Sequence, residues 1–499
     1  MPRPGEVHAK LAEGGSQRPC IPKFYSRILL ELRVLCETSF SSFQPSTYFL
    51  KSFPLSDATL PQYPFHITIC AGTTVRRAAI FFVLVWCVLP GTLFAQRMPW
   101  AEGFSAGNDL EIQLVTIDPG DPVYSWWGHT ALVVTDKKYN LSRFYNYGLF
   151  NFEQDRFFRN FAMGRLLFEV GSLPTQAALR HYRNENRSIR IQTFDMPARI
   201  KMKVALFLET NILPANRQYL YDHYYDNCAT RVRDIINMAT ERQLIDFTDK
   251  PTEMTFRQIT RRFTHRHWAM DTLIMFVMSG VIDIPMSQWQ AMFLPAELER
   301  YVAELIMTDR DGTKRPFVSE TSTYFESSNR NLIPDRAKSA VPRMSLVGLA
   351  IGLFIILIGV PLRQRSFRIL YGTTSTIAGI GMGLPGAVIL FMSLFTDHAF
   401  AYWNENLLLV NVFTALLIPL GVVAAIGKMR KALCWLWIFH LFTAVLLMLF
   451  KVFPAFSQGN WQIIALIAPI SSGYAVAGYL HIIRRLRPAS ARRPQALDQ

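Results

Sequence analysis

Hydrophobic positions from residue 344 onward gather into five long, predominantly apolar stretches, whereas hydrophobic positions before residue 344 alternate with polar ones. Each long stretch has about the 17–25 residues that a membrane-spanning helix needs, the second being somewhat longer. The stretches are 345–362, 369–395, 406–427, 432–450 and 461–483. The pattern predicts an all-α five-helix transmembrane domain over residues 344–483.

Charges between the apolar stretches indicate how these helices are oriented. Basic residues concentrate after the first, third and fifth stretches, which are followed by Arg363, Arg365 and Arg368, by Lys428, Arg430 and Lys431, and by an arginine-rich tail over 484–499. The other two connections, 397–405 and 453–460, contain no Lys or Arg. Because basic loops stay on the cytoplasmic side, we expect a cytoplasmic C-terminus and residue 343 on the opposite side.

A short apolar segment with the features of an export signal precedes residue 96. Arg76 and Arg77 are followed by the apolar run 78–90 and by Ala95, which is the arrangement of a signal peptide over 75–95 with cleavage after Ala95. The alternative, an uncleaved sixth span, would leave the next region on the same side. We expect translation to start at Val75, so residues 1–74 are a mis-called extension or a disordered segment.

Residues 96–309 read as a domain of mixed α and β structure. Alternation predicts strands over 110–117, 128–135, 143–148, 166–170 and 188–192. Helices are expected over 175–184, 198–212 and 228–239, with a more helical stretch from 255 to 304. Residues 310–343 carry prolines at 316, 334 and 342 and read as a tether to the membrane.

The formal net charge of +15 would suit a nucleic-acid-binding protein. However, residues 344–499 carry 12 basic and three acidic residues, so most of the excess lies in the most apolar part of the chain. The charge therefore reports membrane orientation, and we expect no nucleic-acid partner.

Cysteine placement isolates one candidate nucleophile. Of six cysteines, Cys228 alone falls within 96–343. It follows Asp226 and Asn227, both good helix caps and candidates for an oxyanion site, so it is expected in the first turn of a helix. There the helix dipole would lower the thiol pKa. The alternative is a small buried apolar residue at a helix start.

A thiol nucleophile needs a base and a group that orients the base. His129 opens a predicted strand and is the preferred base, with His223 as its rival and His181, His265 and His267 as weaker candidates. Asn146, on the next strand, is the chosen orienting group, although a turn residue beside Gly148 is nearly as good a reading. His265 and His267 lack the further ligands of a metal site, so no metal and no cofactor are expected.

These residues carry a family resemblance. Gly128-His-Thr-Ala-Leu132 before Asn227-Cys228 resembles the circularly permuted NlpC/P60 group of papain-like thiol enzymes, which includes the lecithin:retinol acyltransferase-like proteins. The combination with Tyr145-Asn-Tyr-Gly148, Met292–Pro295, five spans and Asn404–Leu409 is similar to the Lnb-type family over about residues 100–483. The resemblance implies an α+β permuted papain-like periplasmic domain on the bacterial inner membrane.

The resemblance also implies an activity, lipoprotein N-acyltransfer. Cys228 would take an acyl chain from a membrane phospholipid with His129 as base, and pass it to the N-terminal amine of diacylglyceryl lipoproteins. His398, Asn404 and Glu405, in the loop 396–405, would guide the lipid head group, unless they are an ordinary interfacial loop. Two other classes stay open: a periplasmic Cys/His amidase or peptidase acting on cell-wall peptide, which needs at most one anchor, and a non-enzymatic membrane scaffold.

Overall fold

The computed structural model describes residues 97–150, 156–309 and 311–486. The expected signal peptide (75–95), the segment before it (1–74) and the tail beyond residue 486 lie outside the described residues. Described residues from Ser105 onward belong to one compact unit.

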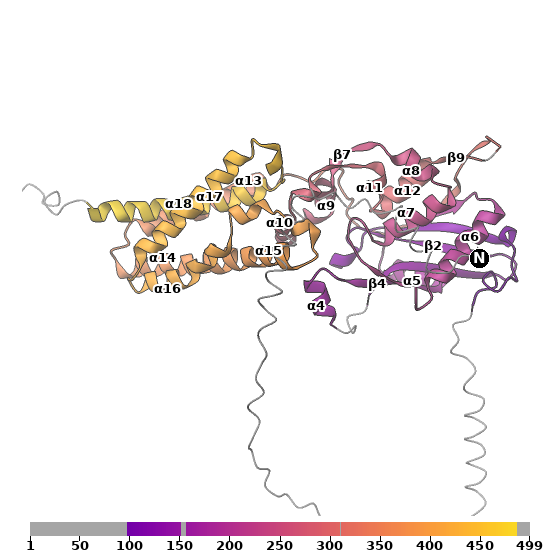
Figure 1. Ribbon diagram of the computed structural model, residues 1–499, viewed down its shortest axis with the longest axis horizontal. Coiled ribbons are helices and arrows are strands. Elements are labelled where there is room, and N and C mark those ends of the chain that lie inside the picture. Colours follow the sequence, from indigo (N-terminus) through magenta and orange to yellow (C-terminus); the bar gives the residue numbers. More distant parts are fainter. Residues whose placement is uncertain (1–96, 151–155, 310, 487–499) are drawn as a thin grey trace, which may run out of the picture. The chain divides into compact units, whose positions relative to one another are not determined.

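A seven-stranded antiparallel sheet forms the centre of the domain that precedes the apolar helices (Figure 1). Its strand order is β11-β5-β1-β2-β3-β4-β6. The strands are β1 (Leu110–Ile117), β2 (His129–Asp136), β3 (Leu141–Leu149), β4 (Leu167–Pro174), β5 (Ile189–Phe194), β6 (Gln218–Leu220) and β11 (Val318–Phe325). The five strands predicted from alternation are confirmed.

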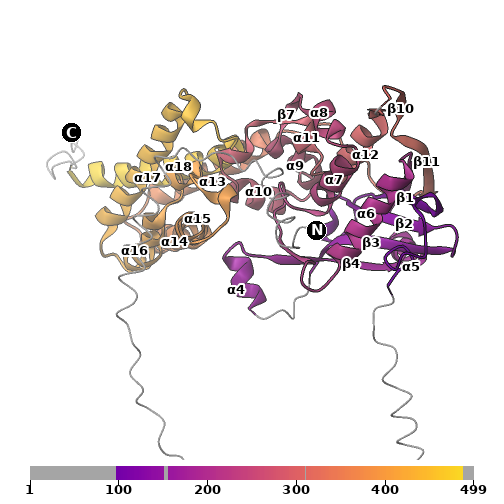
Figure 2. The same ribbon diagram turned by 45° about the vertical axis from the view of Figure 1, so that its right-hand side comes forward.

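Burial on both faces of the sheet explains the composition of its central strands. On β1, Ile112 and Leu114 on one face and Val115 and Ile117 on the other are all fully buried. The cluster that contains Val115 and Ile117 also takes in Ala178 and Leu179 of α5 (Thr175–Asn184). Helices α6 (Ala198–Asn211) and α7 (Cys228–Ala239) pack against β1 and β2 (Figure 2).

The predicted helical stretch from 255 to 304 is confirmed as four helices that follow α8. Helix α8 spans Gln243–Thr248, and the four that follow it are α9 (Phe256–Thr264), α10 (Trp268–Val277), α11 (Gln288–Ala291) and α12 (Pro295–Glu304). Two two-stranded antiparallel sheets accompany them: β7 (Pro251–Thr255) with β8 (Pro285–Ser287), and β9 (Ile306–Thr308) with β10 (Lys314–Pro316).

The segment 310–343 is not a plain tether. Its residues Val318–Phe325 form β11, which pairs antiparallel with β5 at the edge of the large sheet. Most of these side chains are exposed, because an edge strand buries little, and a polar Ser/Thr-rich sequence therefore fits it. The connecting segment that lacks regular structure is thus shorter than expected and runs from residue 326 to 340.

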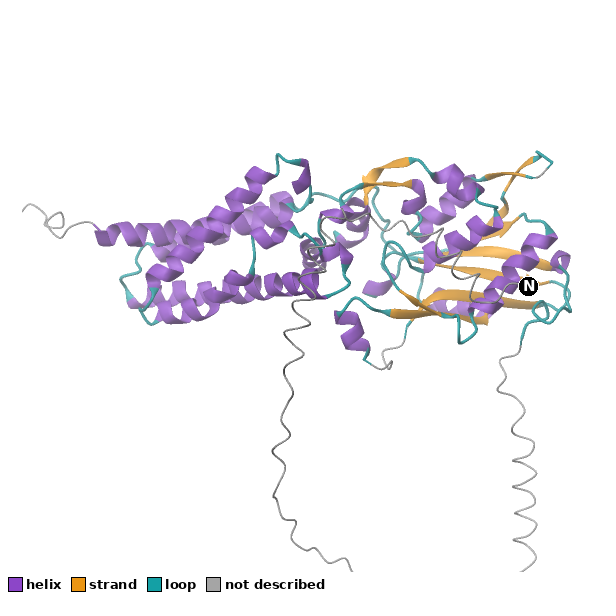
Figure 3. Cartoon of the chain, viewed as in Figure 1, coloured by secondary structure: helices purple, strands orange, loops and turns teal. Residues whose placement is uncertain are grey.

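After residue 340, helices are the only regular secondary structure in the described part of the chain (Figure 3). Four helices are long and apolar enough to cross a membrane, or up to five if one bent pair counts as a span. The four are α13 (Val341–Gly359), the run Arg365–Phe395 that joins α14 to α15, α17 (Arg430–Phe450) and Trp461–His481 of α18 (Trp461–Leu486). The bent pair, Ala399–Leu408 and Val412–Ala425 at 58°, covers the third predicted stretch, so the five-helix count stays a prediction.

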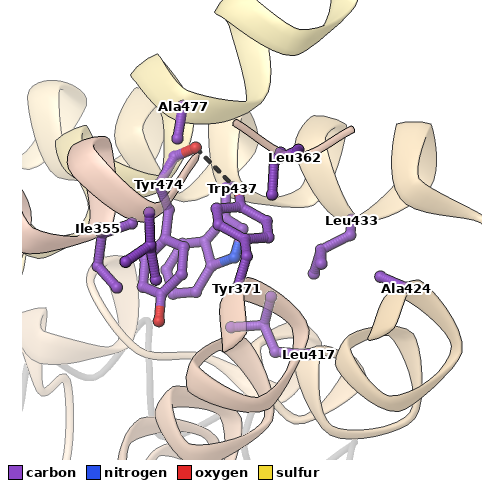
Figure 4. Packing of buried hydrophobic residues seen from close by; sticks show 10 residues of the cluster. Ile355, Leu362, Tyr371, Leu417, Ala424, Leu433, Trp437, Tyr474 and Ala477 are labelled. Atoms are coloured by element: carbon purple, nitrogen blue, oxygen red, sulfur yellow. Dashed lines mark hydrogen bonds between the residues drawn. The ribbon is translucent and has the colours of Figure 1, made fainter. Parts of the chain in front are cut away.

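Aromatic side chains hold the apolar helices together (Figure 4). Trp437 of α17 stacks on Tyr474 of α18 with ring centroids 4.0 Å apart. The Tyr371 hydroxyl of α14 donates a hydrogen bond of 3.1 Å to the Tyr474 carbonyl. In an apolar surrounding such a bond satisfies groups that water does not reach, so it fixes how these three helices pack.

Candidate active site

Cys228 is the first residue of α7, as its sequence context predicts. Asn227 is the N-cap: its Oδ1 accepts from the backbone N–H groups of Ala229 and Thr230, each at 2.9 Å. Its Nδ2 donates to the carbonyls of His223 and Phe293 at 2.8 and 2.9 Å. Four hydrogen bonds from one buried amide therefore fix the backbone on which the thiol stands.

Asp226, the other cap candidate, has a different role. Its carboxylate forms an ion pair with Arg231, one turn into α7, and the Arg231 Nη2 lies 2.7 Å from Asp226 Oδ2. Its backbone forms a bridge with Asp222. Asp226 thus closes the loop before the helix, while Asn227 caps the helix itself.

His129 and Asn146 meet across neighbouring strands. His129 is the first residue of β2, and Asn146 lies in β3. The His129 Nε2 donates to Asn146 Oδ1 at 2.7 Å, which leaves Nδ1 without a proton in the neutral ring. Gly128, at φ +83°, supplies the left-handed turn that leads into β2. The predicted orienting contact is therefore present.

One pocket contains all three predicted catalytic residues. It has a volume of about 710 Å³ and is lined by Cys228, His129 and Asn146 together with many aromatic and aliphatic side chains. Gly148, at φ +95° in a bulge of β3, lies beside the cysteine: a Cβ there would be 3.9 Å from that of Cys228. The absence of a side chain at Gly148 leaves room next to the thiol.

Cys228 and His129 are both neutral at pH 7. Loss of solvent raises the pKa of Cys228 to about 11, although backbone N–H groups, that of Thr130 first, lower it. Burial, followed by the charge of Arg187, lowers the pKa of His129 to about 4, and Asn146 opposes the shift. The expected lowering of the thiol pKa is therefore wrong, because desolvation outweighs the helix terminus.

The rival histidines occupy less suitable positions. His223 also lines the pocket, but its ring packs against Trp127 and Phe293. Among the residues that the structure describes, no group hydrogen-bonds to its Nε2. His181 lies at the pocket edge beside Glu185.

His265 and His267 belong to neither a catalytic nor a metal arrangement. His265 contacts the Arg262 carbonyl through Nδ1, and His267 stacks on Trp126. Within the described ranges, no three His, Cys, Asp or Glu residues form a group that could hold a metal ion.

Two further residues of the pocket were not found from the sequence. Tyr182 of α5 lies against His129, with ring centroids 5.8 Å apart. Arg187 is buried, lines the pocket, and lies 5.2 Å from the centre of the Tyr182 ring. Its local sequence, Asn184-Glu-Asn-Arg-Ser188, looks like an ordinary polar loop, so nothing in it signals a functional arginine.

The predicted lipid-loop residues lie apart from this pocket, and two of them are engaged. Asn404 is buried and donates to the carbonyls of Phe276 and Val277. Glu405 is buried and pairs with Lys451. His398 is partly buried, and its Nδ1 contacts the Thr396 hydroxyl. A head-group role for the three stays a prediction.

Comparison with known proteins gives one match. No curated protein and no solved structure matches the chain. Residues 96–262, which contain β1 to β6, His129, Asn146 and Cys228, match the family model of the Lnb N-terminal periplasmic domain. A periplasmic domain followed by four or five apolar helices fits a membrane protein. Residues 96–262 therefore form a domain similar to the Lnb N-terminal periplasmic domain, which supports the resemblance to the Lnb-type family.

Proposed function

We propose that this protein is a membrane-bound thiol acyltransferase. It moves an acyl chain from a phospholipid, through a thioester on Cys228, to the N-terminal amine of diacylglyceryl lipoproteins. The observation that carries the proposal is the joint position of Cys228 and the His129–Asn146 pair in one largely apolar pocket. An apolar pocket of this size suits an acyl chain better than a cell-wall peptide.

The first half-reaction acylates the enzyme. As the Cys228 sulfur attacks the ester carbonyl carbon, the neutral His129 takes the thiol proton at Nδ1. The C–S bond forms, the ester C–O bond breaks, and the imidazolium returns the proton to the leaving glycerol oxygen. A lysophospholipid leaves. The backbone N–H of Cys228, which Asn227 does not accept from, stabilises the transient oxyanion at the start of α7.

The second half-reaction regenerates the thiol. The α-amine of the lipoprotein attacks the thioester carbonyl, the C–N bond forms, and the C–S bond breaks. His129 takes the proton lost by the amine and returns it to the Cys228 sulfur. Atoms balance without a cofactor, and the product is an amide.

Contacts near the membrane-spanning helices support a lipid substrate. Phe157 and Phe161 of α4 (Phe157–Ala162) line the pocket. The Met163 carbonyl, directly after α4, accepts from the backbone N–H of Asp397 at 2.9 Å, and Arg165 pairs with Asp397 at 2.6 Å. Asp397 lies two residues beyond the span that ends at Phe395. A wall of the pocket therefore lies close to the end of an apolar span, and this supports a lipid substrate.

The proposed location follows from the loop charges. With basic loops and the C-terminal tail in the cytoplasm, the catalytic domain is periplasmic and the protein is a multi-pass component of the bacterial inner membrane. Donor and acceptor lipids then both lie in the leaflet that the domain faces.

The test uses bacteria depleted of their own lipoprotein N-acyltransferase, with lipoprotein N-termini read by mass spectrometry. The wild type should add the third acyl chain, and Cys228→Ala and His129→Ala should leave free amines. Cys434→Ala, which changes the other described free cysteine, should retain activity. Free amines with the wild type, or acylation by Cys228→Ala, would overturn the proposal. New cell-wall fragments in place of acylation would point to the amidase.

A further inference from the structure

Arg187 lines the pocket and has one unused hydrogen-bond donor. The residue is only 3% exposed. Its Nε donates to the Asp118 carbonyl at 2.7 Å and its Nη1 to Glu185 Oε2 at 3.2 Å. No group among residues 97–150, 156–309 and 311–486 hydrogen-bonds to its Nη2, which is buried. An unsatisfied buried guanidinium nitrogen is costly unless a ligand completes it.

The surroundings of Arg187 make it the permanent cation of the pocket. The pocket is also lined by three histidines, the Cys228 thiol and Glu185. The Glu185 carboxylate already pairs with the Arg187 Nη1, and the Glu185 side chain is more than one-third exposed. Tyr182 contacts both Arg187 and His129. The free donor therefore lies one aromatic ring away from the catalytic base.

We propose that Arg187 binds the phosphodiester of the donor lipid, so that the pocket selects glycerophospholipids over uncharged acyl esters. The inference rests on the proposed function, and it adds the group that recognises the donor. Guanidinium forms short, charge-assisted hydrogen bonds with phosphate oxygens, and burial strengthens them. In a glycerophospholipid the phosphate is joined to the reacting ester by a few bonds of glycerol. A cation near the nucleophile is therefore well placed to meet it.

A phosphate fits the free donor better than the reacting carbonyl does. The developing oxyanion can be met by the backbone N–H of Cys228 itself, the first-turn donor of α7 that Asn227 does not accept from. Arg187 instead follows α5 and approaches the pocket from the side of Tyr182 and Glu185. It thus acts on donor binding, as a specificity-determining residue.

The experiment compares two donors that differ only in the phosphodiester. Purified full-length protein in mixed micelles is given a phosphatidylglycerol or the diacylglycerol with the same acyl chains. Acylation of Cys228 is then followed in a single turnover by intact mass. We expect Arg187→Gln to slow transfer from phosphatidylglycerol about 10- to 100-fold and to leave transfer from diacylglycerol within about twofold. Inorganic phosphate at the donor concentration should change neither rate.

Controls separate recognition from folding. Arg187→Lys retains the charge and should fall between wild type and Arg187→Gln, while Arg183→Gln, an exposed residue at the end of α5, should match the wild type. An equal fall with both donors, no change with either, or inhibition by free phosphate would overturn the inference. Absence of any adduct on wild-type Cys228 would instead count against the proposed function.

Discussion

At the scale of single residues, the site depends on which nitrogen of His129 is free to accept a proton. The hydrogen bond to Asn146 fixes the proton on Nε2 and holds the ring, and Asn146 also opposes the fall in the histidine pKa. Because the pKa of His129 is about 4, the base stays neutral through the physiological range. Activity should therefore fall only in acid, when the ring becomes protonated.

Substitution of Asn146 tests this arrangement. Asn146→Ala frees the ring and should lower the Cys228 acylation rate about 10- to 100-fold. Asn146→Asp keeps an acceptor and adds a charge that raises the pKa of His129, so its acid limb should move to higher pH. Single-turnover rates measured between pH 4 and 8 give both results.

Asn184→Ala, at the exposed end of α5, is the matched control and should behave as wild type. If Asn146→Ala were as fast as the wild type, or if the acid limb of Asn146→Asp coincided with that of the wild type, Asn146 would not orient the base.

At the scale of elements, the sequence predicts what local pattern decides. The bounds of β1, α5 and α7 agree with the predicted ones; alternation marks β1, and the Asn227 cap marks the start of α7. The strand β11 was missed, since an edge strand with little burial lacks an apolar signature. Arg187 and Tyr182 were missed because their role comes from the packing of α5 on the sheet, which brings Tyr182 against His129. The rise in the pKa of the Cys228 thiol comes from burial in the folded domain, which the local sequence pattern does not predict.

The cap of α7 gives a prediction at this scale. Asn227→Ala removes the acceptor of two backbone N–H groups and leaves two buried carbonyls without their donor. It should therefore destabilise the domain by about 2–4 kcal/mol. It should also slow acylation per folded molecule, because the thiol loses its support. Thermal unfolding and single-turnover rates measure the two effects.

Thr255→Ala provides the comparison, because Thr255 caps α9 by accepting from the Gln258 N–H. That variant should lose about 1 kcal/mol and keep its acylation rate per folded molecule. Equal rates for Asn227→Ala and Thr255→Ala would mean that the cap stabilises α7 without positioning Cys228.

At the scale of the whole molecule, a buried polar junction joins the domain that holds the large sheet to the apolar helices. Asn404 caps the end of α10 through the Phe276 and Val277 carbonyls. Glu405 pairs with Lys451, and each side chain is only 7% exposed. Gln458 links the two sides, since its backbone N–H donates to Glu405 and its side chain to the Met278 carbonyl. The loops around 404 and 458 therefore hold the domain at the spans.

Breaking this junction should cost far more than breaking an exposed ion pair. Glu405→Gln leaves the Lys451 ammonium buried without its carboxylate, so we expect a loss of about 3–5 kcal/mol. The double variant Glu405→Gln with Lys451→Met removes both charges and should recover part of that loss.

Asp397→Asn is the control at an exposed ion pair. It breaks the pair with Arg165, in which the Arg165 and Asp397 side chains are 47% and 46% exposed, and should cost at most about 1 kcal/mol. Thermal unfolding in detergent ranks the stability of the three variants, and the rate of proteolysis between the domain and the spans gives a second measure. A Glu405→Gln variant as stable as Asp397→Asn would show that the domain is held by its apolar contacts alone.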